Sequence, residues 1–84
     1  RDRIFTISVL LPDKPGELVR VSQVIADKRG NVIKLDHNQF FSTNRSAAVE
    51  LKITLEAFGI EHKKEIIQAL EEAGYKPKQI RPNL

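Results

Sequence analysis

Residues 11–18, Leu11-Pro12-Asp13-Lys14-Pro15-Gly16-Glu17-Leu18, decide the fold, because an alternating apolar segment ends there and an amphipathic segment begins. Proline is favoured in the first turn of a helix, where its missing N–H is not needed. The glycine beside it has no Cβ, so a ligand or a second backbone can approach closely. The free N–H groups of that turn and the positive end of the helix dipole suit a small anion such as a carboxylate. Asp13 adds a negative charge, so the turn offers the two signs of charge that a zwitterionic amino acid needs.

The segments on either side of this turn have different periods. The alternation over residues 4–11 predicts a strand whose apolar face is Phe5, Ile7, Val9 and Leu11. The spacing over residues 15–29 predicts a helix whose core stripe is Leu18, Val21, Ser22, Val24 and Ile25. Gly30 is expected to stop this helix, since glycine is favoured just beyond a helix C-terminus.

The remaining segments predict two strands, a helix and a final strand. Residues 31–41 and 47–58 read as strands joined by a polar turn, and the second alternates so regularly that one of its faces is expected to be solvated. A second helix is predicted over residues 61–73. Residues 75–81 read as a short strand, in which Pro77 is expected at a sheet edge or in the first positions of the strand. The order β-α-β-β-α-β predicts a ferredoxin-like α+β fold, a four-stranded antiparallel sheet with two helices on one face.

Composition bounds the class of protein. The 84 residues, 40% hydrophobic and 30% charged, predict a single soluble domain over 1–84. Apolar runs are too short to cross a bilayer and there is no signal-peptide pattern, so no membrane partner is expected. The absence of cysteine excludes disulfides, thiol nucleophiles and iron–sulfur centres and permits a cytoplasmic location. The net charge of +3 comes largely from basic residues that we expect to be solvated.

The sequence argues against a nucleic-acid, catalytic or metal site. The outward faces of the two strands expected at the centre of the sheet, residues 4–11 and 47–58, carry no aromatic platform for RNA bases. His37 and His62 lie on different predicted elements without the neighbours of a catalytic triad, and no metal-ligand spacing occurs. His62 is expected to be solvated, and His37 is a surface residue or a ligand contact.

The sequence resembles the ACT domains, small regulatory domains that sense amino acids, in Leu11-Pro12-Asp13-Lys14-Pro15-Gly16 and in Gly30-Asn31-Val32. With His37 and Glu71-Glu72-Ala73-Gly74-Tyr75 it is similar, more narrowly, to the C-terminal ACT domain of pyridoxal-phosphate-dependent threonine dehydratases (threonine ammonia-lyases). The resemblance implies that residues 1–84 are a C-terminal fragment of such an enzyme. It also implies that this domain is not itself an enzyme and holds no cofactor, pyridoxal phosphate being bound by a lysine of the separate catalytic domain.

The same resemblance implies a ligand site. Asp13 would meet the ligand's amino group, and the backbone of residues 15–18 would hold its carboxylate. Asn31, with Val32, would come from a neighbouring copy, because such domains pair side by side. The implied ligand-binding residues are Leu11, Asp13, Lys14, Pro15, Gly16, Glu17, Leu18, Asn31 and Val32. Leu11 stands where serine-sensing relatives carry a histidine, which argues against a serine-type ligand. The resemblance also implies regulation by branched-chain amino acids or by nucleotides, depending on the subfamily, and isoleucine, valine or threonine are the expected effectors.

Two functions therefore remain open. In the first, the chain is an allosteric domain in which two or more copies bind an amino acid at their seam. In the second, it only holds an enzyme together as a homodimer or higher oligomer, and Asp13, Gly16 and Asn31 merely shape turns. An apolar strip on the strand over 31–41, formed by Ile33, Leu35 and Phe41, would serve either function. The effector, the sign of its effect and the biosynthetic or catabolic role of the parent enzyme are undetermined by sequence.

Overall fold

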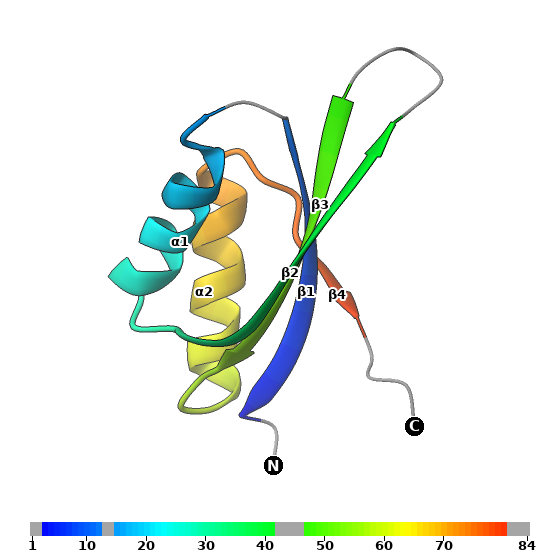
Figure 1. Ribbon diagram of the computed structural model, residues 1–84. Coiled ribbons are helices and arrows are strands. Elements are labelled where there is room, and N and C mark those ends of the chain that lie inside the picture. The colour runs from blue at the N-terminus through cyan, green and yellow to red at the C-terminus, as the bar shows by residue number, and fades with distance from the viewer. Residues whose placement is uncertain (1–2, 13–14, 42–46, 81–84) are drawn as a thin grey trace.

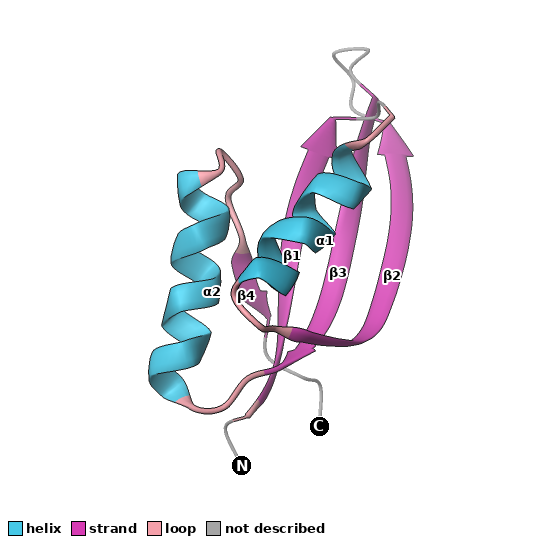
Figure 2. Ribbon diagram, turned by 90° about the vertical axis from the view of Figure 1, so that its left-hand side faces the viewer, coloured by secondary structure: helices cyan, strands magenta, loops and turns pink. Residues whose placement is uncertain are grey.

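A computed structural model of the chain describes residues 3–12, 15–41 and 47–80, with only the backbone described over residues 38–41 and 47–48. The elements in chain order are β1 (Ile4–Pro12), α1 (Glu17–Asp27), β2 (Asn31–Phe41), β3 (Ala47–Glu56), α2 (Ile60–Glu72) and β4 (Lys78–Ile80). The four strands form one antiparallel sheet in the order β2-β3-β1-β4. Both helices cover the same face of this sheet (Figure 1, Figure 2). The predicted ferredoxin-like α+β fold is confirmed.

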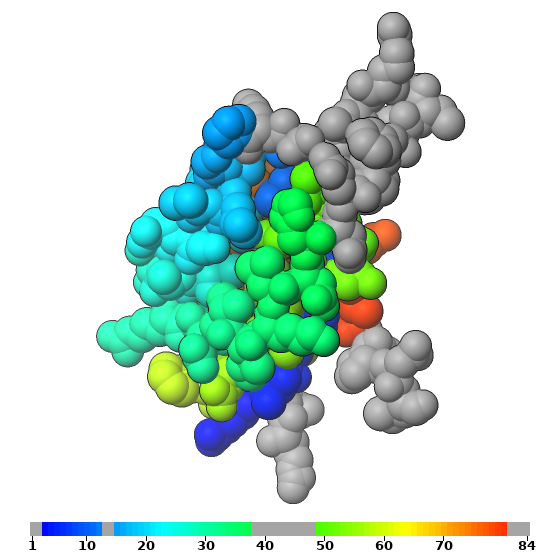
Figure 3. Space-filling model, in the orientation of Figure 1, coloured from blue at the N-terminus to red at the C-terminus, as the bar shows by residue number. Residues whose placement is uncertain are grey.

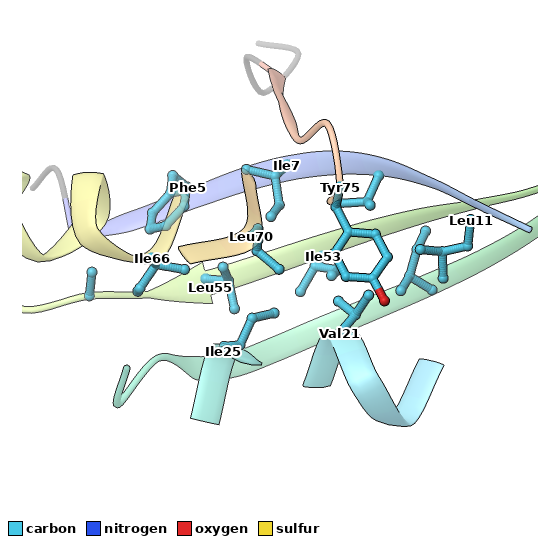
Figure 4. Close-up of a cluster of buried hydrophobic side chains, with 13 residues drawn as sticks. Phe5, Ile7, Leu11, Val21, Ile25, Ile53, Leu55, Ile66, Leu70 and Tyr75 are labelled. Atoms are coloured by element: carbon cyan, nitrogen blue, oxygen red, sulfur yellow. The ribbon is translucent and has the colours of Figure 1, made fainter. Parts of the chain in front are cut away.

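The core lies between the sheet and the helices (Figure 4). The inward faces of β1 and β3 supply it through the alternation seen in sequence, and each helix adds two fully buried side chains. The residues less than 2% exposed are Ile7, Val9, Val21, Ile25, Leu51, Ile53, Leu55, Ile66 and Leu70. Removing such residues from water is the main favourable term in folding, about 1.5–3 kcal/mol for each fully buried side chain.

The start of α1 differs from the prediction. Pro15 was expected in the first helical turn, but the helix begins at Glu17 and Gly16 is its N-cap residue. Gly16 has a φ of 90°, in the left-handed region that residues with a Cβ rarely adopt. One residue with a left-handed backbone, Gly16, therefore separates Pro15 from the helix, so Pro15 lies before the N-cap and not in the first turn.

The end of α1 also differs from the prediction, because the helix ends at Asp27 and Gly30 is not the left-handed residue beyond it. That residue is Arg29, with a φ of 65°. Its N–H donates to Ala26 O and the N–H of Gly30 donates to Ile25 O, which is the Schellman pattern. Gly30 is required for packing instead, since a Cβ there would lie 2.6 Å from Cγ2 of Ile25.

The fourth strand is shorter than the predicted segment 75–81. It covers Lys78–Ile80 and pairs with β1 at the edge of the sheet. Pro77, which has no N–H to donate, directly precedes the paired residues, and Tyr75 is drawn into the core instead of the sheet. The predicted edge position of this strand is confirmed.

At the other edge, β2 pairs with β3. A β-bulge interrupts their register between Val32 and Lys34. Beyond the bulge, Leu35 stands opposite Ile53, whose side chain is buried beneath the helices, and Lys34 stands opposite Thr54 on the open face of the sheet. Beyond the bulge, β2 thus carries Leu35 on the helix side and the charged residues Lys34 and Asp36 on the open side.

Candidate functional site

The turn between β1 and α1 is open to solvent. Pro15 and Gly16 are exposed, and a Cβ built at Gly16 meets no atom within 4 Å. Glycine is therefore required here by its φ of 90° and not by crowding. Among the described residues, no side chain caps this end of α1, and the first backbone hydrogen bond of the helix runs from Arg20 N to Gly16 O, 3.0 Å long. The N–H groups that precede Arg20 in the first turn have no acceptor within an α-helix, which is the feature that suits a carboxylate.

A polar cluster connects the start of α1 to the residues that directly follow α2. The hydroxyl of Tyr75 donates to Oε1 of Glu17 at 3.0 Å. Arg20 lies over the Tyr75 ring, 5.5 Å from its centroid, and donates to the carbonyl oxygen of Ala73 at 3.1 Å. Figure 4 shows the Tyr75 ring reaching across the core toward the helix that carries Val21. The end of α2 and the start of α1 are thereby joined beside the open turn.

Tyr75 was not identified as part of the site from the sequence. Burial and then the hydrogen bond to Glu17 raise the pKa of the Tyr75 phenol above its ordinary value. The signal in the sequence was its place directly after Gly74, in the position whose side chain contacts the last helical turn of a Schellman motif. A large side chain there reaches the neighbouring helix.

The predicted ligand-binding residues at the turn fall into three groups. Asp13 and Lys14 lie outside the described residues. Leu11 is 4% exposed and belongs to the core, so only its backbone faces the turn. The third group lies in the described turn, where Pro15, Gly16 and Leu18 are exposed. The carboxylate of Glu17 accepts a hydrogen bond from the hydroxyl of Tyr75. For all of these residues, ligand binding stays a prediction.

Asn31 and Val32 lie far from the turn within one copy of the chain. They follow the C-terminal end of α1, whereas Gly16 precedes its N-terminal end, and an 11-residue helix is about 16 Å long. The amide of Asn31 donates to Oε1 of Glu56 at 3.3 Å on the open face. A single copy therefore does not bring the two parts of the predicted site together.

Figure 3 shows the surfaces of α1 and β2 next to each other. Several large apolar side chains of these two elements are exposed. We call this the α1–β2 surface, and it consists of Leu18, Val32, Ile33 and Leu35. These side chains are between 36% and 50% exposed, although each is large and hydrophobic. The predicted strip on β2 is thus exposed at Ile33 and Leu35, while the side chain of Phe41 lies outside the described part. Exposed apolar groups that share one face are typical of a surface that contacts another molecule.

A second feature lies at the opposite end of α1. A hollow of about 570 Å³ is lined there by the residues that follow α1 and by the start of α2. His62, expected to be solvated, is half-buried beside it: Nδ1 accepts the N–H of Phe58 at 2.9 Å, so Nε2 carries a proton and donates to the carbonyl of Lys28. The ring also stacks on Phe58, with centroids 4.9 Å apart. His62 therefore joins the end of α1 to the turn before α2, a structural role.

His37 lies on β2 opposite Leu51, exposed on the helix side of the sheet. Among the described residues, no group of three or more acidic, histidine or cysteine side chains is placed to hold a metal ion. The helices in the described ranges are also too short and too polar to cross a membrane.

The chain is 33% identical, over 73 residues, to an L-threonine ammonia-lyase of Geobacter sulfurreducens. The match covers 87% of this chain and 18% of that protein, so the chain spans less than a fifth of the relative's length. This chain is thus similar in sequence to part of a threonine ammonia-lyase. No protein-family model matches the sequence.

One solved structure resembles the fold closely. The crystal structure of an unknown protein from Galdieria sulphuraria superimposes with a TM-score of 0.70 at 17% sequence identity. The alignment covers 94% of this chain and 50% of that one. At this level of identity the likeness supports the fold alone.

Proposed function

We propose that this chain is an amino-acid-sensing regulatory domain of ACT type that belongs to a threonine ammonia-lyase. The observation that carries the proposal is the turn at Gly16, where the chain adopts a left-handed residue and where no side chain of the described residues caps the N-terminus of α1. The similarity to part of an L-threonine ammonia-lyase supports the choice of parent enzyme. Threonine breakdown to 2-oxobutanoate and ammonia would take place in the catalytic part of that enzyme, where pyridoxal phosphate binds.

The effector would bind where two copies meet. Its carboxylate would accept hydrogen bonds from the N–H groups of residues 16–18, and Asp13 would bind its amino group. Asn31 and Val32 of the second copy would close the site, which explains why one copy leaves them at the far end of α1. Isoleucine, valine and threonine are the effectors that the resemblance to threonine dehydratases leads us to expect, and Leu11, at the position where serine-sensing relatives have histidine, argues against serine.

Regulation follows from differential binding. An amino acid that contacts both copies favours the arrangement in which both halves of the site are close together. The effector shifts activity only by the difference between its affinities for the two arrangements, and a coupling free energy of about 1–3 kcal/mol is typical of allosteric regulation. The bracing of the turn by Tyr75 supports this proposal, because a fixed turn transmits ligand binding to both helices.

Calorimetric titration of the 84-residue chain with isoleucine, valine, threonine, serine and AMP tests the proposal, with the mass in solution measured in parallel. Saturable binding of one of these, lost in Gly16→Val, is the expected result, since valine at a φ of 90° distorts the turn. Gly59→Val is the matched control: Gly59 is also an N-cap glycine with open space around it, but its φ of 169° is ordinary extended backbone. Equal binding by wild type and Gly16→Val would contradict a site at this turn.

The alternative function is assembly without sensing. The exposed α1–β2 surface favours it specifically, because this surface suits a second copy whether or not a ligand is present. A stable dimer that binds none of the compounds above would support the alternative.

A further inference from the structure

The hollow between the end of α1 and the start of α2 is lined by residues that take no part in the proposed effector site. Its volume of about 570 Å³ lies within the range of about 300–1,000 Å³ that is usual for small-molecule sites. A smaller hollow of about 250 Å³ adjoins it, because Arg29 and Phe58 line both. The turn between β3 and α2, which carries Phe58, lies beside the beginning of β1 and away from the start of α1 (Figure 1, Figure 2).

Phe58 presents an exposed aromatic ring that is already held in place. It is 70% exposed, more than any other large hydrophobic residue in the described ranges. The His62 ring stacks on it with the two planes 19° apart, and the N–H of Phe58 donates to Nδ1 of His62 at 2.9 Å. His62 thus covers one face of the Phe58 ring and leaves the other face outside. An ordered ring loses little entropy when a second planar group stacks on it.

Arg29 supplies a positive charge beside this ring. Its backbone is left-handed, with a φ of 65°, whereas the equivalent position after α2 is occupied by Gly74. A residue with a Cβ is strained in this conformation, and strain of this kind is found most often at functional sites. The chain therefore keeps a guanidinium beside Phe58 at a position where glycine fits the backbone better.

The smaller hollow favours an anionic group. Arg3 lines it together with Arg29 and Phe58, and neither guanidinium forms an ion pair within the described residues. Glu56 also lines this hollow, and its carboxylate accepts a hydrogen bond from the amide of Asn31 at 3.3 Å. Guanidinium groups bind a carboxylate or a phosphate through two parallel N–H bonds, so two of them beside one hollow suit such a group.

The larger hollow has the opposite balance of charge. Three acidic and two basic residues line it, namely Asp27, Glu61, Glu65, Lys28 and Arg29. A second anionic group is unfavourable next to these carboxylates, whereas an uncharged ring can rest against Phe58. The two hollows together therefore suit a molecule that is charged at one end and planar at the other.

We propose that the place where the two hollows meet binds a small molecule in which a planar ring is joined to a carboxylate or a phosphate. The ring stacks on the exposed face of Phe58, and the anionic group accepts hydrogen bonds from Arg29 and Arg3. The molecule lies outside the turn before α2, which His62 keeps closed. This site goes beyond the proposed function and does not depend on it, because Gly16 lies at the other end of α1.

Four probes test the need for both parts of the ligand. Phenyl phosphate and phenylacetate carry a ring and an anionic group, benzyl alcohol carries only the ring, and inorganic phosphate carries only the charge. Each is titrated into the 84-residue chain while the backbone amide signals are followed by NMR. We expect saturable shifts at Arg29, Phe58 and Gly59 with phenyl phosphate or phenylacetate, and a dissociation constant of about 1–10 mM. The tighter of these two identifies the anionic group, and the other two probes should bind at least about fivefold more weakly.

Substitutions at the two contact residues locate the site. Phe58→Leu should raise the dissociation constant about fivefold or more, whereas Phe58→Tyr keeps the ring and should bind as the wild type does. Arg29→Gln removes the charge and should weaken binding by a similar factor. Val19→Ala, at a residue 69% exposed on α1, and Lys78→Gln, exposed on β4, are the matched controls and should bind normally. The amide spectrum of each variant shows whether it is folded.

The outcomes separate this site from the proposed function. Absence of saturable shifts, shifts confined to the turn at Gly16, or equal binding of phenyl phosphate and inorganic phosphate would overturn the site. Wild-type binding by both Phe58→Leu and Arg29→Gln would also overturn it. None of these results affects amino-acid binding at Gly16, which is measured with other ligands. A chain that binds phenyl phosphate beside Phe58 but no amino acid would support this site and count against the proposed function.

Discussion

The two helices of this fold end alike and begin differently. Each C-terminus is a Schellman motif, with the carbonyl of the residue at the third position from the end, Ile25 in α1 and Leu70 in α2, accepting an N–H from beyond the helix. Each N-cap is a glycine that no side chain in the described ranges caps, but Gly16 is left-handed and Gly59 is extended. The two C-termini have the same motif because the chain must turn back toward the sheet after each helix.

The difference between the two beginnings indicates where a ligand can enter. Before α2, the turn is closed by His62, which bonds to Phe58 and to Lys28 across the molecule. Before α1, the bracing comes from behind, through Tyr75 and Glu17, and the exposed residues Pro15 and Gly16 are left on the outside. One turn is held by contacts on its surface, and the other is held from the core while its surface stays open.

Removing the closure at His62 has the largest expected effect on this comparison. His62→Ala deletes two hydrogen bonds and the stack on Phe58, and we expect it to lower the free energy of unfolding by about 1–3 kcal/mol. Urea unfolding measures the change. His37→Ala is the control, since His37 is exposed on an edge strand and its loss should cost less than about 0.5 kcal/mol. Equal stability of the two variants would contradict a structural role for His62.

Removing the brace behind the open turn has a smaller effect that depends on pH. Tyr75→Phe keeps the ring in the core but loses the bond to Glu17, at a cost of about 0.5–1.5 kcal/mol at neutral pH. Burial raises the pKa of Tyr75 in the folded state, so its contribution to stability is complete below the unfolded value near 10 and is lost as pH rises through the folded value. The stability gap between wild type and Tyr75→Phe should therefore narrow in alkali.

Because Tyr75 is the only tyrosine, ultraviolet titration of tyrosinate reports it directly. A titration midpoint at or below the ordinary value, or a gap that is independent of pH, would contradict the brace.

The alternation of β1 and β3 and the glycine and proline punctuation were enough to predict the element order and the sheet edges, since burial of one face determines them. The identity of the left-handed residue after α1 was not predictable. The sequence suggested Gly30, but the residue with the positive φ is Arg29. Glycine is needed one residue later, at Gly30, because Ile25 approaches closely there. The Tyr75–Glu17 contact was missed for a related reason: it joins residues 58 apart, and periodicity carries no information on such pairs. For the candidate site, the sequence predicted the turn and placed Asn31 beyond the other end of the same helix, but it could not show that Tyr75 holds the turn through Glu17.

The smallest expected effect comes from substitutions at Arg29 and Gly74, the left-handed residues that follow the two helices. Arg29 adopts a φ of 65° where Gly74 adopts 100° in the same position of the same motif. Arg29→Gly should stabilise the fold by about 0.5–1 kcal/mol, because the relief of left-handed strain exceeds the extra entropy that glycine loses on folding. Gly74→Arg should destabilise it by a similar amount, since no atom lies within 4 Å of a Cβ there and strain alone opposes the change. Thermal unfolding of both variants measures these shifts; destabilisation by Arg29→Gly would mean that the arginine side chain contributes more than its backbone costs.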